Sequence, residues 1–357
     1  MNAMADGNEG TTPVRPGYSF DETALIGWMK DHVPGFDGTL AVEQFKGGQS
    51  NPTYKLLTPT GNYVLRRKPP GQLLPGAHAV DREARVIGAL HDADFPVPAV
   101  MGLCMDQSVI GTLFYVMEMV EGRVFWDVTL PDVKREDRSR YFDAMNATIA
   151  QLHGLNYQAM QLSDFGRPGN YFQRQIGRWS KQYLDDGEAG RDANMDKLVK
   201  WLPENIPQGA DRSAIVHGDC RIDNMIFHPT EPQVIAVLDW ELSTIGHPFA
   251  DFAYNAMMYR LPPHMVAGLS GTDLSQLNIP TEAQYLAAYC SRLGLESMPG
   301  YDFYIAFNFF RLAAIFHGIK GRAIRGTASS AQAQERISIL PELMDLAWQQ
   351  AVRAGAR

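Results

Sequence analysis

Cysteine is scarce in this chain of 357 residues, which contains only three. Cys104, Cys220 and Cys290 are far apart and belong to no paired motif. This pattern excludes a disulfide framework and a cysteine-based zinc site, because both need several cysteines at suitable spacings. We therefore expect the protein to occupy a reducing, cytoplasmic setting.

The chain also lacks a long hydrophobic run and an excess of positive charge. No segment approaches the length of a transmembrane helix, and the opening residues, MNAMADGNEG, lack the charged and apolar regions of a signal peptide. Lys and Arg total 32 against 40 Asp and Glu, which gives a net charge of −8. We therefore expect neither a membrane nor nucleic acid as a partner, and these totals leave the oligomeric state open.

Hydrophobic periodicity predicts an α+β fold with two lobes. The Gly, Asn and Thr content of residues 1–18 predicts a flexible leader. A smaller, β-rich lobe is expected over residues 19–120, beginning with a short helix that Ser19 and Glu22 would cap. Helical periodicity predicts the main helix of this lobe at 78–91, and alternating patterns predict its strands at 40–45, 53–58, 63–67, 97–104 and 112–120.

Residues 121–357 are expected to form a larger, α-rich lobe. Helical periodicity predicts its helices at 136–153, 170–185, 192–202, 249–260, 281–293, 301–322 and 332–353. A strand-rich island between Ile215 and Asp239 interrupts these helices. The residues best suited to catalysis lie within this island.

The segment VHGDCRIDNMIF, followed by LDWE, carries the strongest chemical signal. Asp219 and Asn224 have the spacing D-x-x-x-x-N, and Asp239 follows two short strands that can pair as a hairpin and return it to Asn224. Phosphoryl transfer uses such a set, because one carboxylate deprotonates the attacking hydroxyl while Asn and Asp oxygens hold Mg²⁺ on the phosphates. The alternative is an Asp-rich surface loop without a catalytic role.

H-G-D-x-x-x-x-N followed by D-W-E resembles the catalytic and metal-binding motifs of the aminoglycoside phosphotransferase family. The resemblance spans roughly 20–350 and implies the two-lobed protein-kinase fold. It implies that Asp219 is the catalytic base and that Asn224 and Asp239 bind the metal. It also implies ATP and Mg²⁺ as cofactors and a small-molecule hydroxyl as the acceptor, without distinguishing ATP from GTP.

Three neighbours of these motifs have expected roles. Arg221 stands where protein kinases commonly carry a lysine that contacts the transferred phosphate, so it could neutralise developing charge, although a surface arginine is the alternative. His217 is expected to be structural. Asp251, in HPFADFAY, matches a family aspartate that braces the catalytic loop rather than binding substrate.

The strand YVLRR of the smaller lobe would supply part of a nucleotide site. Val64 and Arg66 share one face, with Val64 suited to the base and Arg66 to the phosphates. Kinases usually place lysine here, but guanidinium also binds phosphate. Glu83 lies on the apolar stripe of the helix at 78–91 and is expected to pair with Arg66, as in the lysine–glutamate pair of kinases. A shift of register could put Arg67 or Lys68 there instead, and a partly exposed Glu83 is the further alternative.

Two connecting segments complete the expected nucleotide site. The loop that contains Gly47, Gly48 and Ser50 lies where the family covers the phosphates, although a simple hairpin turn is the alternative. The segment MEMVEG, which includes Met117 and Met119, ends the last strand of the lobe where the hinge should be. Its backbone groups would bind adenine.

The tracts GGQSNPTY, RRKPPGQLLPGAHAVDRE and HGDCRIDNMIFHPTEPQVIAVLDWELSTIGHP resemble the kinase-like domains associated with acyl-CoA dehydrogenases. The segment 301–325 combines aromatic residues with several cations, which suits a hydroxylated acyl acid or its CoA ester, although an aromatic stripe is more often core. We therefore expect an ATP-dependent kinase for such an acceptor. The alternatives are an antibiotic-modifying aminoglycoside phosphotransferase and a catalytically silent kinase-like binding module.

Overall fold

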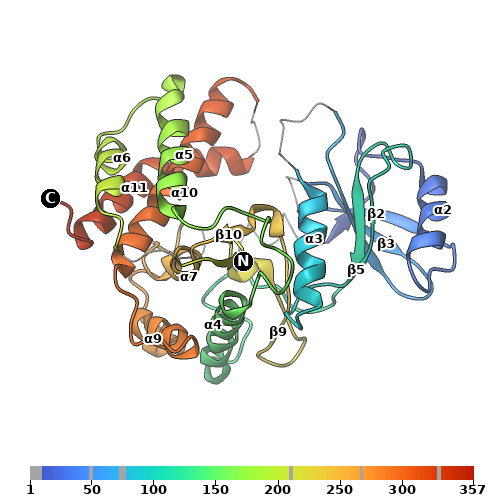
Figure 1. Cartoon of the computed structure of the whole chain (residues 1–357), viewed down its shortest axis with the longest axis horizontal. Coiled ribbons are helices and arrows are strands. Elements are labelled where there is room, and N and C mark those ends of the chain that lie inside the picture. Colours follow the sequence, from blue (N-terminus) through green and yellow to red (C-terminus); the bar gives the residue numbers. More distant parts are fainter. Residues whose placement is uncertain (1–9, 48–50, 72–77, 209–211, 266–267, 328–330) are drawn as a thin grey trace. The chain divides into compact units, whose positions relative to one another are not determined.

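The computed structural model describes residues 10–47, 51–71, 78–208, 212–265, 268–327 and 331–357 (Figure 1). By their internal contacts these residues form two compact units. The described residues of the first unit fall within Met1–Pro131, Tyr157–Phe165 and Ile222–Ser243, and those of the second fall within Asp132–Asn156, Gly166–Arg221 and Thr244–Arg357.

An antiparallel sheet of six strands forms the centre of the first unit, in the order β1-β2-β3-β4-β6-β5. The strands are β1 (Thr11–Thr12), β2 (Ala41–Phe45), β3 (Thr53–Leu57), β4 (Tyr63–Arg67), β5 (Val100–Cys104) and β6 (Phe114–Glu118). Strand β1 lies within the segment expected to be a flexible leader, and it pairs with β2 through Thr11 opposite Phe45.

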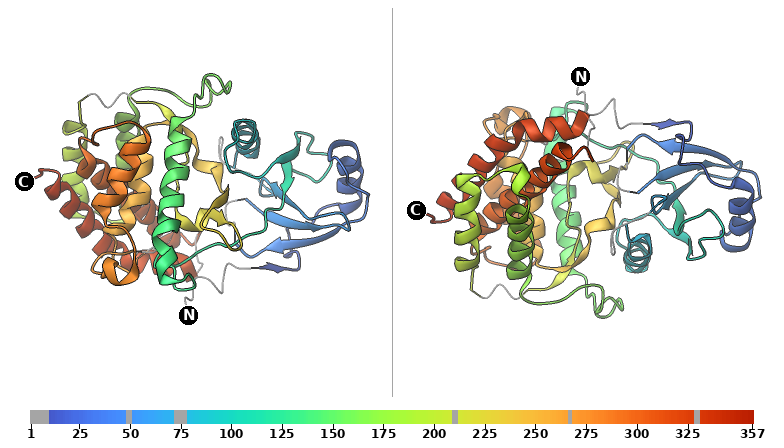
Figure 2. Two further views of the ribbon diagram at one scale, coloured as in Figure 1. Left: turned by 90° about the horizontal axis from the view of Figure 1, so that it is seen from below. Right: turned by 90° about the horizontal axis from the view of Figure 1, so that it is seen from above.

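Two helices cover opposite faces of this sheet (Figure 1, Figure 2). Helix α2 (Glu22–His32) packs Leu25 and Met29 into the cluster that holds Leu65 of β4. Helix α3 (Val80–His91) lies on the other face, where the next residue of β4, Arg66, reaches it. The expected cap of α2 is wrong: Asp21, not Ser19, accepts the hydrogen bond from Ala24, because the helix begins three residues after Ser19.

A hairpin from the expected larger lobe packs with the first unit instead. It consists of β8 (Met225–Phe227) and β9 (Val234–Val237) and leads into the 3-10 helix η4 (Trp240–Leu242). The ring of Trp240 packs edge-on against Phe95, and the Val237 N–H donates to the carbonyl of Pro96 at 2.8 Å. Burial of this large ring joins the hairpin to the sheet-bearing unit. The expected boundary at residue 120 assigned the hairpin to the larger lobe.

The second unit consists mainly of helices. They are α4 (Arg138–Gly154), α5 (Tyr171–Asp185), α6 (Ala193–Glu204), α7 (Pro248–Ala256), α8 (Leu274–Leu277), α9 (Glu282–Arg292), α10 (Tyr301–Ile324) and α11 (Ala331–Arg353). Two short strands, β7 (Ala214–Val216) and β10 (Thr244–Gly246), pair antiparallel and hold α7 beside the segment that follows β7. The expected α+β fold class, with a β-rich and an α-rich part, is confirmed.

Helix α10 is the core of the second unit. Its buried aromatic side chains are Phe303, Tyr304, Phe307, Phe309, Phe310 and Phe316. They pack against α5, α7 and α11, as in the stack of Phe172 on Tyr304 at 5.2 Å between ring centroids. The aromatic run at 301–325 is therefore core, and it gives no structural support to an apolar acceptor wall.

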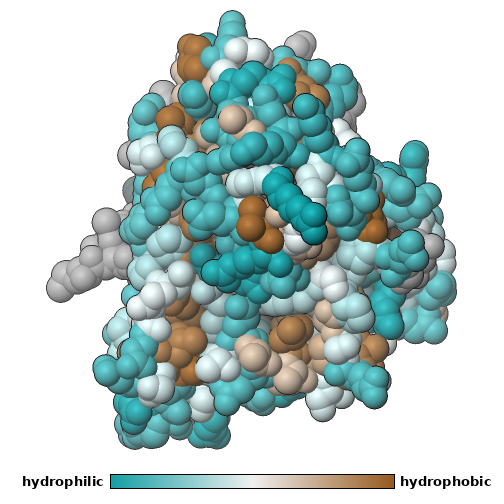
Figure 3. Space-filling view, turned by 90° about the vertical axis from the view of Figure 1, so that its left-hand side faces the viewer, coloured by the Kyte–Doolittle hydropathy of each residue, from teal (hydrophilic) through white to brown (hydrophobic). Residues whose placement is uncertain are grey.

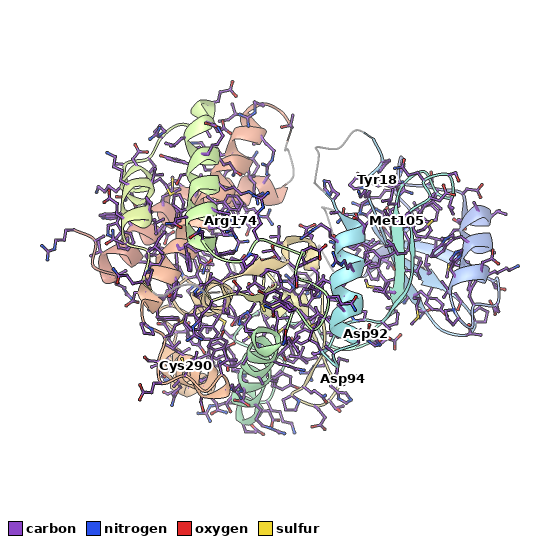
Figure 4. All side chains as sticks on the ribbon, in the orientation of Figure 1. Tyr18, Asp92, Asp94, Met105, Arg174 and Cys290 are labelled. Atoms are coloured by element: carbon purple, nitrogen blue, oxygen red, sulfur yellow. The ribbon has the colours of Figure 1, made fainter. Side chains whose placement is uncertain are left out.

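Few of the large apolar side chains in the described ranges are exposed. The face in Figure 3 is mostly hydrophilic, with hydrophobic residues scattered over it. Across the described ranges, no helix has both the length and the apolar character that crossing a membrane requires. All three cysteines are buried free thiols, and Cys290 lies in α9 (Figure 4).

Candidate active site

Asp251 of α7 fixes the backbone of segment 217–220 in the second unit. Its carboxylate accepts hydrogen bonds from the N–H groups of His217 and Gly218, both at 2.8 Å, and contacts Nε2 of His153 at 3.2 Å. Burial favours the neutral acid, but these hydrogen bonds and the nearby histidines outweigh it and lower the pKa of Asp251. The expected bracing role of Asp251 is confirmed, because the bonds fix the backbone just before Asp219.

The backbone conformation at position 218 explains why the H-G-D motif has glycine there. Its φ is +86°, a conformation that L side chains rarely adopt. The carbonyl of Gly218 accepts a hydrogen bond from Nη2 of Arg311, on α10, at 2.7 Å. Two helices thus hold the peptide groups that precede Asp219, and the positive φ at position 218 favours glycine there.

One helical turn beyond Asp251, two further side chains of α7 bind the same segment. The hydroxyl of Tyr254 donates to Oδ1 of Asp219 at 2.6 Å, and the amide of Asn255 donates to the carbonyl of Cys220 at 3.0 Å. Residues three and four apart on a helix share one face, so these groups align with successive residues of the segment. Helix α7 therefore positions the Asp219 side chain as well as its backbone.

Asp219 is an ionised, partly exposed carboxylate. Its side chain is 24% exposed, and Nε of Arg221 lies 3.6 Å from Oδ1. Burial favours the neutral acid, but the charge of Arg221 and the hydrogen bond from Tyr254 outweigh it and lower the pKa of Asp219. A carboxylate that stays ionised at neutral pH and keeps contact with solvent is suited to accept a proton from a substrate hydroxyl.

In the first unit, the hairpin brings Asn224 and Asp239 together. Met225 pairs with Val237, and the Leu238 N–H donates to the carbonyl of Asn224 at 2.8 Å. Asp239 has a left-handed backbone, with φ +66°, and its side chain is 36% exposed. The chemistry of this pair, a carboxylate and an amide oxygen, fits Mg²⁺, which prefers oxygen ligands.

Among the described residues, protein side chains alone do not form a complete metal site at the hairpin. Within the described ranges, no group of three or more His, Cys, Asp and Glu side chains is arranged to hold an ion. Mg²⁺ commonly binds one or two protein carboxylates together with the phosphates of a nucleotide. Asn224 and Asp239 would therefore hold it jointly with a bound nucleotide.

Arg66 and Glu83 form the ion pair expected from the sequence. Nε of Arg66 lies 2.7 Å from Oε2 of Glu83, and both residues are buried. Nη2 of Arg66 also contacts the carboxylates of Asp239 and Glu241, at 2.8 and 3.6 Å. Burial disfavours the cation, but Glu83 and the other acidic groups raise the pKa of Arg66, so its charge is secure.

The register alternatives for Arg66 are wrong. Arg67 points to the opposite face of β4, with its guanidinium 5.4 Å from the ring centroid of Phe20. Lys68 lies beyond the strand and reaches Asp81 at 3.8 Å. Successive residues of a strand alternate between faces, so only Arg66 can meet Glu83.

Replacing Glu83 with glutamine is expected to destabilise the first unit by about 3 kcal/mol, because a buried cation loses its nearest counter-charge. Urea unfolding would measure the change. The control is Asp81→Asn on the same helix, which removes the partly exposed ion pair with Lys68 and should cost less than about 1 kcal/mol. Equal losses in the two variants would contradict the role assigned to the buried pair.

The remaining expected nucleotide residues lie around β4 and β6. Val64 is buried and pairs with Met117 of β6. The N–H of Met119 donates to the carbonyl of Asn62 at 3.3 Å, so an adenine base would need other backbone groups of the segment. Gly47 is half-buried, whereas Gly48 and Ser50 lie outside the described residues.

Gly122 shows how the segment after β6 meets the hairpin. A Cβ atom at this position would lie 2.4 Å from the carbonyl oxygen of Phe227 and 2.5 Å from the Ile226 side chain. The N–H groups of Arg123 and Phe227 donate to each other's carbonyls at 2.8 Å. A side chain at position 122 would therefore separate two backbones that are directly hydrogen-bonded.

Sequence reasoning missed several residues that orient the expected ones. Asn51 donates to Oε1 of Glu83 at 2.8 Å, and the Tyr115 hydroxyl donates to Oε2 at 3.2 Å. Neither residue carries a sequence signal, because a single polar group within a strand or just before one has many roles. Tyr254 did carry one: it lies one helical turn after Asp251, on the same face of α7.

Comparison with known proteins identifies relatives of this chain. The mouse protein (Mus musculus) acyl-CoA dehydrogenase family member 10 is 42% identical over 350 residues, which are 97% of this chain and 33% of that protein. The chain thus spans about a third of the length of this curated relative.

Two solved structures share the fold. A crystal structure from Ralstonia eutropha, provisionally described as an aminoglycoside phosphotransferase, is 48% identical, has a TM-score of 0.86, and the match covers 94% of this chain and 99% of that one. An aminoglycoside phosphotransferase bound to AMP-PNP and hygromycin B has a TM-score of 0.61 at 14% identity, covers 94% of this chain and 100% of that one, and shows the fold alone. A model of the phosphotransferase enzyme family matches residues 41–304. The chain belongs to this family, with its kinase-like fold.

Proposed function

We propose that this protein is an ATP-dependent phosphotransferase that transfers the γ-phosphate to a hydroxyl group of a small molecule. The observation that carries the proposal is Asp219, an ionised and partly exposed carboxylate whose backbone and side chain are both held by α7. A surface aspartate without a role would not need this support. The pairing of Asn224 with the residues before Asp239 adds the oxygen ligands that a magnesium–nucleotide complex uses.

The proposed reaction forms a bond between the acceptor oxygen and the γ-phosphorus and breaks the bond from that phosphorus to the β–γ bridging oxygen. ADP leaves, and the hydroxyl proton passes to the carboxylate of Asp219. Mg²⁺, when bound with ATP, would neutralise phosphate charge. Asn224 and Asp239 hold it in this proposal, and Arg221 stabilises the charge that develops on the transferred group.

The nucleotide is assigned to the first unit. Arg66 supplies the cation for the phosphates and Val64 the apolar contact for the base, while the backbone after Met117 faces the adenine. The contact of Arg66 with Asp239 supports this assignment, because it joins the phosphate-binding cation to the proposed metal ligand. Arginine replaces the usual lysine at position 66, and this replacement is the one feature that favours a silent binding module. Guanidinium stays charged, so Arg66 can still bind the phosphates.

The acceptor proposed here is a hydroxylated acyl acid or its CoA ester. The mouse relative is named for the acyl-CoA dehydrogenase family, which supports an acyl substrate for this chain by analogy. The charges around Asp219 add a physical argument. Nε of Arg221 lies 3.6 Å from Oδ1 of Asp219, so a cation stands beside the proposed base. An anionic acceptor would gain charge-assisted hydrogen bonds there, and a polycation would be repelled.

The experiment that tests this function measures ADP release with Mg²⁺ and ATP. Hydroxyacyl acids and their CoA esters are compared with kanamycin-like aminoglycosides at matched concentrations. We expect turnover with the acyl compounds only. Turnover with the aminoglycosides alone would overturn the acceptor and leave the kinase activity, whereas nucleotide binding without any turnover would indicate a binding module.

The buried free thiols fit the reducing, cytoplasmic setting that we also propose.

A further inference from the structure

We propose that Tyr254 is the residue that positions the catalytic base: its hydroxyl holds one carboxylate oxygen of Asp219 and so sets the orientation in which the base meets the acceptor. This inference rests on the proposed function of Asp219. The positioning group is a phenol supplied by α7. The motif H-G-D-x-x-x-x-N does not include this residue.

The geometry of the contact is that of a strong hydrogen bond. The Tyr254 oxygen lies 2.6 Å from Oδ1 of Asp219, within the short range typical of a hydroxyl that donates to a carboxylate. Tyr254 is buried, so it cannot exchange this partner for bulk water without a rearrangement. Burial and the charge of Asp219 both raise the pKa of Tyr254, which keeps the phenol protonated and therefore a donor.

The ring of Tyr254 is itself held in place. The guanidinium of Arg311 lies 5.2 Å from the ring centroid and at the same time donates to the carbonyl of Gly218. One cation thus fixes both the ring and the peptide that precedes Asp219. Asp251 also binds the backbone N–H groups of this segment, so the side chain of Asp219 and the backbone before it are both held.

Several charged and titratable groups act on Asp219, so the effect of Tyr254 on the pKa of Asp219 must be separated from theirs. They are His217, Cys220 and Arg221 on its own segment, Tyr254 on α7, Arg311 on α10 and Arg336 on α11, while Asp251 of α7 binds the backbone before Asp219. Removal of the Tyr254 hydroxyl leaves every charge in this set unchanged. The variant Tyr254→Phe also keeps the ring against Arg311, so it removes one hydrogen bond and little else.

The first test is the titration of the Asp219 carboxyl carbon by NMR, in protein labelled with ¹³C at aspartate and with the signal assigned from its absence in Asp219→Asn. A hydrogen bond to the charged form lowers a carboxyl pKa, so its loss should raise the midpoint in Tyr254→Phe by about 1 to 2 pH units. The matched control is Tyr183→Phe, which removes a buried phenol that donates to a different carboxylate, Asp196, at 2.9 Å. Its Asp219 midpoint should equal that of the wild-type protein.

The second test is the pH profile of kcat/KM, because a residue that only supports the fold would not move it. The base must be ionised, so activity falls as the pH drops through its pKa, and this acid limb should shift to higher pH in Tyr254→Phe by the same amount as the NMR midpoint. Unchanged midpoint and limb in Tyr254→Phe would overturn the inference. If the wild-type protein shows no phosphoryl transfer, the proposed function fails, while the NMR midpoints still decide whether Tyr254 controls Asp219.

Discussion

Replacing Asp219 with alanine or asparagine is expected to lower kcat for phosphoryl transfer by about 10² to 10⁴-fold, the range that a general base contributes. Affinity for the nucleotide should change by no more than a few-fold, because the proposed contact of Asp219 is with the acceptor hydroxyl. Steady-state ADP release would give kcat, and calorimetric titration with a non-hydrolysable ATP analogue would give the dissociation constant.

The control for Asp219 is Asp137→Asn, which removes a partly exposed aspartate paired with Arg140 at 3.1 Å. Turnover of this variant should match the wild-type protein. Near-normal turnover in both Asp219 variants would show that another group takes the proton. A parallel loss of nucleotide binding would instead point to a structural defect around segment 217–220, since Asp219 is one of the residues that α7 holds.

Asp239→Asn is expected to weaken Mg²⁺-dependent nucleotide binding and to lower kcat by about 10²-fold or more, because a charged metal ligand becomes neutral. Asparagine is a suitable substitute here, since it tolerates the left-handed backbone of Asp239 better than most residues. The change should therefore be electrostatic rather than conformational. Titration of the nucleotide with and without Mg²⁺ would show it as a loss confined to the metal-containing samples.

The chain offers a closely matched control for Asp239. Asp94 also has a left-handed backbone, with φ +55°, and is exposed (Figure 4). Asp94→Asn makes the same chemical change in the same backbone conformation and should leave both binding and rate unchanged. If Asp239→Asn binds the magnesium–nucleotide complex as tightly as Asp94→Asn does, Asp239 is not a metal ligand.

Much of the fold was predictable because its patterns are local. The alternation in YVLRR correctly placed Arg66 opposite Glu83, since strand geometry and a costly buried carboxylate allow few other pairings. The hairpin that returns to Asn224 also followed from short apolar runs around a turn. Helix α10 was recognised as a helix, but its aromatic residues serve the core and not a substrate surface.

What escaped prediction depends on contacts between distant segments. The packing of the hairpin with the sheet-bearing unit depends on the ring of Trp240 against Phe95, and no local sequence pattern predicts this contact. Pairing of β7 with β10 joins residues on either side of the catalytic motifs. The roles of Asn51 and Tyr115 at Glu83 likewise depend on tertiary placement, because each is a single polar group within a strand or at its edge.

The central claim is that the hydroxyl oxygen of a small molecule attacks the γ-phosphorus of ATP. The most direct test uses an acceptor whose hydroxyl carries ¹⁸O, with the phosphorus of the product followed by ³¹P NMR in the presence of Mg²⁺ and ATP. We predict a phosphate ester signal with the isotope shift of a bridging ¹⁸O, formed together with ADP and lost in Asp219→Ala. Formation of ADP and inorganic phosphate without this ester would contradict the claim.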